Sequence, residues 1–150
     1  MRTAGMKRVS LGFLKNGDKI LLYLRDDMRN ISYPNHWALL GGQIEGAETP
    51  QDALVREIQE EIGCQAGNTT LVGRLDVVNN PMCEDHTIFL FKGEIHNRLE
   101  EMQLTEGQRL GYFTMEEFRT LKFPDFLRAF ILEKIMGEKG AAGQRRLAVE

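Results

Sequence analysis

The sequence predicts an α/β fold in which a mixed β-sheet lies between helices. Strand-like segments at residues 9–13 and 20–24 flank Asn16-Gly17, a strong signal for a tight hairpin turn. Later strand-like segments alternate with helical ones, so crossover connections accompany the hairpin, and both kinds together indicate a mixed sheet. A chain of 150 residues with 42% hydrophobic content is long enough for one core, which predicts a single domain spanning residues 1–150.

The first two strands should differ in burial. Val9, Leu11 and Phe13 alternate with polar or small residues, as in a half-exposed strand, whereas residues 20–24 form a continuous apolar run typical of a strand buried on both faces. A polar loop then leads through a short strand at residues 37–40 to Gly41-Gly42. Paired glycines allow close backbone approach, so N–H or carbonyl groups there can reach a ligand or a metal.

A helix over residues 50–62 has clear signals at both ends. Thr49 is a suitable N-cap, and Pro50 fits the first helical position, where no N–H is needed. Asp52 stands three residues after the cap, which predicts a capping box, and Gly63 supplies the stop.

This helix separates apolar from acidic side chains. At about 100° per residue, one face carries Leu54, Val55, Ile58 and Ile62, and Glu57, Glu60 and Glu61 gather on another. Carboxylates this close resist ionising together, and a hard divalent cation such as Mg²⁺ or Mn²⁺ removes that conflict. The alternative interpretation of the three glutamates is an ordinary solvated helix face.

The second half of the chain predicts three strands and two helices. Gly73 interrupts the first of these strands and indicates a bulge. Thr114 and Glu117 form a capping box that opens a helix to about residue 121, and Pro124 introduces a last amphipathic helix. Residues 138–150 are rich in Gly, Ala and charge, which predicts a disordered tail. The three strands are expected at residues 71–78, 87–91 and 110–113.

Charge and cysteine content narrow the class of protein. The formal net charge is −3, so no broad basic field is present for a nucleic-acid backbone, and a nucleic-acid partner is not expected. Cys64 and Cys83 do not make a disulfide framework and suit a reduced compartment. No apolar run reaches transmembrane length, and residues 1–10 lack a secretory signal. These features predict a cytoplasmic protein with no membrane partner.

Residues 42–64 carry a pattern far more specific than an acidic helix. The stretch resembles the Nudix box, with Cys64 at a usually aliphatic position and Leu40 where proline commonly precedes the glycines. The resemblance implies an α/β/α sandwich with a mixed sheet, and hydrolysis of a nucleoside diphosphate linked to another group. The matching positions are Gly42, Glu48, Arg56, Glu57, Glu60, Glu61 and Gly63.

The resemblance also implies a metal site. Glu57, Glu60 and Glu61 match the metal-binding glutamates, and the carbonyl of Gly41 matches a backbone ligand. Glu57 further matches the position proposed as general base in some members. Glu106 looks similar to a glutamate that MutT-type members contribute from outside the box, as a further ligand or base; its alternative is a solvated turn residue.

Supporting and substrate-binding residues complete the expected site. Arg56 and Glu48 match a catalytic supporting pair in which the arginine orients a glutamate. Arg25, at a strand end, faces either a phosphate or solvent, and the Gly42 backbone can approach a ligand. Trp37 is either a core residue or part of a base pocket.

The most specific expectation is a MutT-like nucleoside triphosphate pyrophosphohydrolase that yields a monophosphate and pyrophosphate with Mg²⁺ or Mn²⁺. A nucleotide-sugar or ADP-ribose hydrolase is the alternative within the family, and a non-catalytic Nudix-fold nucleotide-binding module is the alternative outside enzymology. All three box glutamates are present, which favours an enzyme. The expected partner is a small nucleotide, and the chain is expected to be a monomer or a homodimer.

Overall fold

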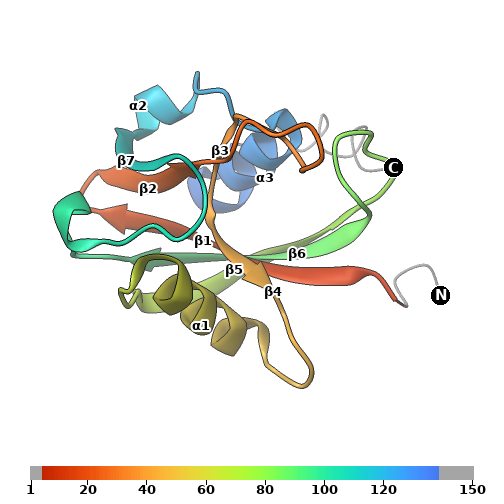
Figure 1. Ribbon diagram of the computed structural model, residues 1–150, viewed down its shortest axis with the longest axis horizontal. Helices are drawn as coiled ribbons and strands as arrows, with labels where there is room; N and C mark the ends of the chain where they lie inside the picture. The colour runs from red at the N-terminus through yellow and green to blue at the C-terminus, as the bar shows by residue number, and fades with distance from the viewer. Residues whose placement is uncertain (1–4, 139–150) are drawn as a thin grey trace.

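A mixed sheet of seven strands runs through the protein in the computed structural model, which describes residues 5–138 (Figure 1). Residues 139–150 of the expected disordered tail therefore lie outside the described residues. The elements in chain order are β1 (Lys7–Asn16), β2 (Lys19–Leu24), β3 (Trp37–Ala38), β4 (Leu40–Gln43), α1 (Pro50–Ile62), β5 (Gly67–Val77), β6 (His86–Glu94), a short 3₁₀ turn (Leu99–Glu101), β7 (Arg109–Thr114), α2 (Met115–Phe118) and α3 (Asp125–Met136).

Strand β1 organises the sheet, whose order is β3-β2-β1-β6-β5. It pairs in parallel with β6 along its length, and antiparallel with β2 at Lys15 and Asn16, which confirms the predicted hairpin. Its first half, from Val9 to Gly12, pairs instead with β4. β2 and β4 therefore pair with different halves of β1.

Helices cover both faces of the sheet, so the expected sandwich is confirmed (Figure 1). On one face, Leu54, Ile58 and Ile62 of α1 pack in a buried cluster with residues of β1, β2 and β4. On the other, α2 and α3 contribute Phe118 and Phe130 to a second cluster. Within residues 5–138, no helix is both long and apolar enough to span a membrane.

The expectation that β1 is half-exposed is wrong. Phe13 is 1% exposed and Leu14 on the opposite face is fully buried, because β1 is central and helices cover both its faces. Even Ser10 is fully buried, and its hydroxyl donates to the carbonyl oxygen of Pro50 at 2.6 Å. This hydrogen bond attaches the first residue of α1 to the centre of the sheet.

The expected strand at residues 37–40 is two strands. Trp37 and Ala38 pair with β2, whereas β4 begins at Leu40 and pairs with β1, so the chain changes partner at Leu39. This change of partner delivers Gly41 and Gly42 to the face of the sheet that α1 covers.

The predicted ends of α1 and the predicted bulge agree with the structure, whereas the capping box expected at Thr49 is present only as its first hydrogen bond. Thr49 accepts a hydrogen bond from the Asp52 N–H at 3.1 Å, and Gly63 ends α1 with φ of 71°. Thr114 forms its capping box, although α2 ends at Phe118, earlier than expected. The register of β5 against β6 shifts just before Gly73, which confirms a bulge there.

Candidate active site

The glycine bend of β4 lies directly against α1. Gly41 has φ of 144°, and a Cβ there would stand 2.0 Å from the carbonyl oxygen of Ser10, so no side chain fits. A Cβ at Gly42 would stand 2.3 Å from Cδ of Glu57. Gly42, expected to contact substrate, thus makes room for a glutamate of α1, and its backbone also lines the adjacent pocket.

Glu61 is a buried acid at this contact. Glu61 is only 9% exposed, and its Oε1 accepts a hydrogen bond from the Gly41 N–H at 3.1 Å. Burial is the main reason that the pKa of Glu61 is raised to about 8, and the nearby charges of Glu57, Glu106 and Glu60 raise it further. Among residues 5–138, no lysine or arginine forms an ion pair with it. Glu61 is therefore a buried carboxyl group without a countercharge.

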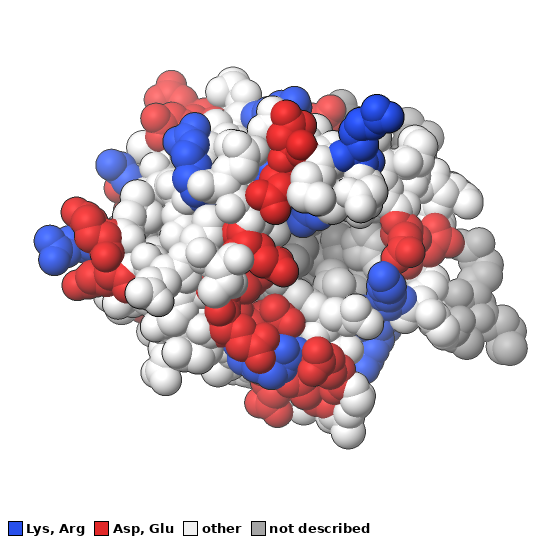
Figure 2. Space-filling model, viewed as in Figure 1, with Lys and Arg blue, Asp and Glu red and all other residues white. Residues whose placement is uncertain are grey.

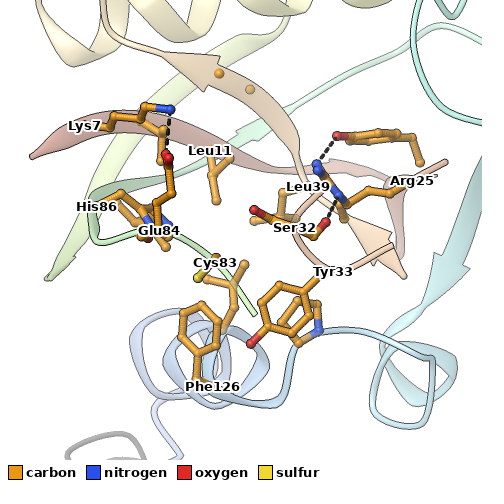
Figure 3. A pocket seen from close by; sticks show the side chains of 18 residues that line it. Lys7, Leu11, Arg25, Ser32, Tyr33, Leu39, Cys83, Glu84, His86 and Phe126 are labelled. Atoms are coloured by element: carbon orange, nitrogen blue, oxygen red, sulfur yellow. Dashed lines mark hydrogen bonds and ion pairs between the residues drawn. The ribbon is translucent and has the colours of Figure 1, made fainter. Parts of the chain in front are cut away.

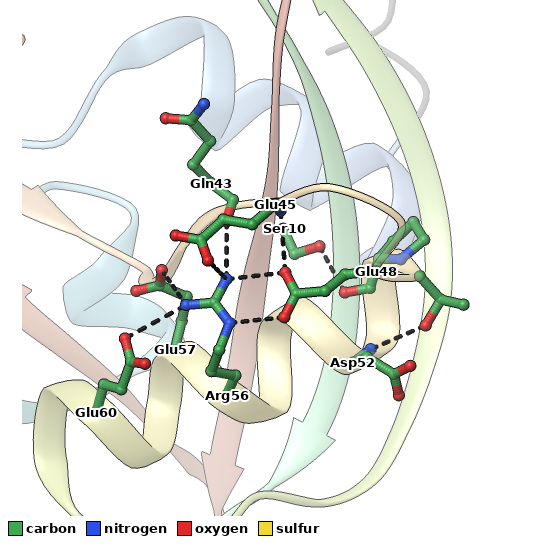
Figure 4. A network of polar contacts seen from close by, with 10 residues as sticks. Ser10, Gln43, Glu45, Glu48, Asp52, Arg56, Glu57 and Glu60 are labelled. Atoms are coloured by element: carbon green, nitrogen blue, oxygen red, sulfur yellow. Dashed lines mark hydrogen bonds and ion pairs between the residues drawn. The ribbon is translucent and has the colours of Figure 1, made fainter.

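Arg56 connects α1 to the loop before it (Figure 4). Its Nε and Nη2 donate to the two carboxylate oxygens of Glu48 at 2.6 and 2.9 Å, a bidentate contact. Nη2 also donates to the carbonyl oxygen of Gln43 at 3.0 Å. Nη1 donates to Glu57 at 2.9 Å and to Glu60 at 3.3 Å. The arginine thus joins Glu48 of the loop to two glutamates of the helix, Glu57 and Glu60.

The three box glutamates point in different directions. Glu57 is 17% exposed and lies against Gly42, whereas Glu60 is 60% exposed and turns toward Arg56. For this reason no group of three His, Cys, Asp or Glu side chains within the described part of the chain is close enough to hold a metal ion. The donors are nonetheless all oxygen, the ligand type that hard divalent cations prefer, and the buried carboxyl of Glu61 has no countercharge among the described residues.

The loop before β7, which carries Glu106, is hydrogen-bonded to both α1 and β2. The Thr105 N–H donates to the Glu61 carbonyl oxygen at 3.0 Å, and the Gln108 N–H donates to the Leu24 carbonyl oxygen at 2.8 Å. Anchored to α1 and to β2, the loop brings Glu106 close enough to raise the pKa of Glu61. Acidic side chains accordingly gather over α1 and the loops around it, beside a hollow in the surface (Figure 2).

A pocket of about 270 Å³ adjoins the glycine bend (Figure 3). Leu11 and Leu39 form the side toward the sheet. Across from them lie the rings of Tyr33 and Phe126, with centroids 6.1 Å apart, one from the loop after β2 and one from α3. The pocket is mostly apolar with aromatic walls, a composition that suits a flat heteroaromatic group.

Arg25, expected to face either a phosphate or solvent, lies in the wall of this pocket. Its Nε donates to the Ser32 carbonyl oxygen at 2.7 Å, and Nη1 donates to the Tyr23 hydroxyl at 3.1 Å. Arg25 and Tyr23 also line a smaller neighbouring pocket of about 190 Å³, together with Glu106. The arginine therefore stands between the apolar pocket and the acidic side chains.

Trp37 does not line either pocket and is a core residue. It is 7% exposed, its ring packs edge-on against Phe113 at 4.7 Å between centroids, and the Arg109 guanidinium lies 5.0 Å from it. Its neighbour Ala38 lines the pocket instead, because successive side chains of a strand point to opposite faces. The suggestion that Trp37 forms a base pocket is corrected accordingly.

Sequence reasoning missed three residues of the site. Tyr23 was counted only within an apolar run, Phe126 only within the apolar stripe of the last helix, and Tyr33 only within a polar loop. Each belongs to a different element, and only the fold brings them together. The one local signal was Tyr33-Pro34, since a bulky aromatic residue in an otherwise polar loop often packs against a neighbouring element.

The family is shown by comparison with known proteins. A model of the NUDIX domain matches residues 6–133. The 8-oxo-dGTP diphosphatase of Proteus vulgaris is 42% identical over 55 residues, which cover 37% of this chain and 46% of that protein. The RNA pyrophosphohydrolase of Sulfurovum sp. (strain NBC37-1) is 30% identical over 110 residues, covering 71% and 66%. The chain thus spans about half to two thirds of the length of these relatives.

Solved structures agree with the fold. The crystal structure of a MutT NUDIX hydrolase from Burkholderia pseudomallei superposes with a TM-score of 0.71 at 20% identity, covering 86% of this chain and 97% of that one. At this level of identity the likeness shows the fold alone. Because the family match covers most of the described residues and includes the site around α1, this chain belongs to the Nudix hydrolase family.

Proposed function

We propose that this protein is a MutT-like nucleoside triphosphate pyrophosphohydrolase that requires Mg²⁺ or Mn²⁺ and releases a nucleoside monophosphate and pyrophosphate. The observation that carries the proposal is the position of Glu57 and Glu61. Both lie against the Gly41-Gly42 bend, which also lines an apolar pocket with aromatic walls. The bend therefore contacts acids suited to a metal and also lines a space suited to a nucleobase.

Members of the family generally use divalent cations. Here the metal would be held by Glu57, Glu60, Glu61, Glu106 and the Gly41 carbonyl. When bound, a divalent metal polarises the diphosphate and generates a strong nucleophile from water. Glu60 is largely exposed, and its contact with Arg56 is a surface ion pair of small worth, so it can turn toward the site at little cost.

The supporting residues keep the acids in place. Arg56 holds Glu57 through Nη1, and Glu48 holds Arg56 by a bidentate contact. Glu57 is then the candidate to accept a proton from the attacking water, because its carboxylate is partly buried and fixed against Gly42. Arg25, in the wall between the pocket and the acids, is placed to neutralise phosphate charge.

The substrate class is argued from size, charge and similarity. The pocket of about 270 Å³ accommodates one base, and the chain carries a net charge of −3, which favours a free nucleotide over a polynucleotide. The name of the Proteus vulgaris relative, 8-oxo-dGTP diphosphatase, supports a nucleoside triphosphate. A nucleotide-sugar or ADP-ribose substrate is the alternative that a substrate panel distinguishes.

The test is product analysis on a panel of nucleotides with Mg²⁺. We expect release of pyrophosphate and monophosphate from at least one nucleoside triphosphate, with kcat lowered roughly 100-fold or more in Glu60→Gln. Glu100→Gln makes the same charge change on an exposed residue of the 3₁₀ turn and should behave as wild type. A wild type as inactive as Glu60→Gln on every compound would favour the binding-module alternative, and cleavage restricted to nucleotide sugars or ADP-ribose would refute the triphosphate assignment.

A further inference from the structure

The Tyr23 hydroxyl is a buried polar group that the proposed chemistry does not use. Tyr23 lies in β2, is 8% exposed, and belongs to the same buried cluster as α1. Its ring is covered by the loop before β7, since a Cβ on Gly107 would stand 2.7 Å from Cδ2 of the ring. The ring is therefore held in place, and the direction of the hydroxyl is set by the fold.

Hydrogen bonding leaves the proton of this hydroxyl without a partner. Arg25 Nη1 lies 3.1 Å from the hydroxyl oxygen, and a guanidinium only donates, so Tyr23 is the acceptor in that bond. A phenol is protonated at neutral pH and can still donate once. Within residues 5–138, no acceptor forms a hydrogen bond with it. A buried donor of this kind costs free energy unless a ligand or water accepts its proton.

The location of Tyr23 identifies what that ligand would be. Tyr23 and Arg25 line both the apolar pocket beside the glycine bend and the smaller pocket that contains Glu106. A nucleotide with its base in the first pocket and its metal-bound group among the acids must pass this pair. The sugar joins these two places, and the phosphate chain begins where the sugar ends. Because Tyr23 and Arg25 also line the smaller pocket beside Glu106, the acceptor on that side is a phosphate oxygen.

We propose that the Tyr23 hydroxyl donates a hydrogen bond to a phosphate oxygen of the nucleotide, with Arg25 fixing the direction of the donor. This inference rests on the proposed function, because it assumes a nucleotide in the adjacent pocket. A neutral hydroxyl suits this position, since it contributes a donor to an anionic acceptor without adding a charge beside Glu61 and Glu106. The hydrogen bond from Tyr23 exists before the phosphoanhydride bond is cleaved, so it strengthens substrate binding and does not raise kcat.

Tyr23→Phe tests the assignment, because it keeps the ring and removes only the hydroxyl. We expect KM for the nucleotide and Kd for Mg²⁺–pyrophosphate each to rise roughly 10- to 100-fold, with kcat changed less than about threefold. Tyr112→Phe is the matched control. It removes a hydroxyl that donates to the Asn97 carbonyl oxygen at 2.7 Å, away from both pockets, and should leave KM, kcat and Kd unchanged.

Several results would overturn the inference. The inference is wrong if Tyr23→Phe binds pyrophosphate as tightly as wild type does. It is also wrong if wild type shows no measurable pyrophosphate binding. A fall in kcat with unchanged KM for the nucleotide, together with weaker binding of Mg²⁺, would show that the hydroxyl orients Glu61 instead. The Kd for Mg²⁺–pyrophosphate is measured by calorimetric titration, which needs no turnover. A wild type inactive on the whole panel would therefore refute the proposed function, while the titration would still decide the role of Tyr23.

Discussion

Glu61→Gln should stabilise the metal-free protein at neutral pH while it abolishes metal-dependent activity. Burial raises the pKa of Glu61 to about 8, above its ordinary value of 4.5. Between these two values the folded protein holds a proton that the unfolded chain has released. Stability therefore falls as the pH rises through this window, and the loss is absent below it. Glutamine resembles the protonated acid, keeps an oxygen for the Gly41 N–H, and has no proton to lose.

The size of the effect follows from the width of the window. Each pH unit between the unfolded and folded pKa values of one carboxyl group changes the free energy of unfolding by about 1.4 kcal/mol. Between pH 5.5 and pH 7.5, the free energy of unfolding of wild type should therefore fall by about 2 to 3 kcal/mol more than that of Glu61→Gln. This is a large share of the stability of an ordinary domain.

Urea denaturation in EDTA at the two pH values measures this difference directly. Glu60→Gln is the matched control from the same helix; its side chain is 60% exposed, and it should follow the wild-type pH dependence. Added Mg²⁺ at pH 7.5 should recover stability in wild type and much less in Glu61→Gln, because the bound ion supplies the missing countercharge. Parallel stability curves for wild type and Glu61→Gln from pH 5.5 to 7.5 would refute the reasoning.

The remaining predictions concern the glycine bend and Arg56. Gly41→Ala should lower stability by about 3 kcal/mol, because its Cβ meets the backbone of Ser10 at 2.0 Å; chemical denaturation measures this, and a change under about 1 kcal/mol would contradict it. Gly42→Ala meets only the side chain of Glu57, so it should stay folded and lose roughly 100-fold in kcat; wild-type kcat would refute the contact. Arg56→Lys keeps the charge but loses the bidentate fork, so kcat should fall roughly 10- to 100-fold with little change in KM, and full activity would show that charge alone suffices.

Local signals were sufficient where a single segment determined the outcome. The ends of α1 were predicted to the residue because Thr49, Pro50 and Gly63 act on their own backbone. The bidentate pair of Arg56 and Glu48 was implied by the family pattern. The contact between Glu60 and Arg56 could also have been predicted, because the two residues stand four positions apart on one helix. It was not predicted, because all three acids were expected to converge on a metal.

Non-local pairing explains what the sequence did not reveal. The break at Leu39 exists because β3 pairs with β2 while β4 pairs with β1, and no local periodicity records a change of partner. The pairing of β3 with β2 likewise decides which of its two side chains faces the core, Trp37, and which faces the pocket, Ala38. The facing rings of Tyr33 and Phe126 depend on two segments more than ninety positions apart in the chain.

The attachments of α1 hold two acids of the proposed metal site in place. The helix begins at Pro50, whose carbonyl accepts from buried Ser10, and ends beside Glu61, whose carbonyl accepts from the Thr105 N–H. Glu57 and Glu61 are thus held by Arg56 and by the Gly41 N–H, whereas Glu60 would turn away from Arg56 to reach a metal. In the metal-free protein, protonation of Glu61 would offset the missing countercharge. The proposed site would therefore combine two fixed acids with a less stable metal-free protein, the relation that Glu61→Gln measures.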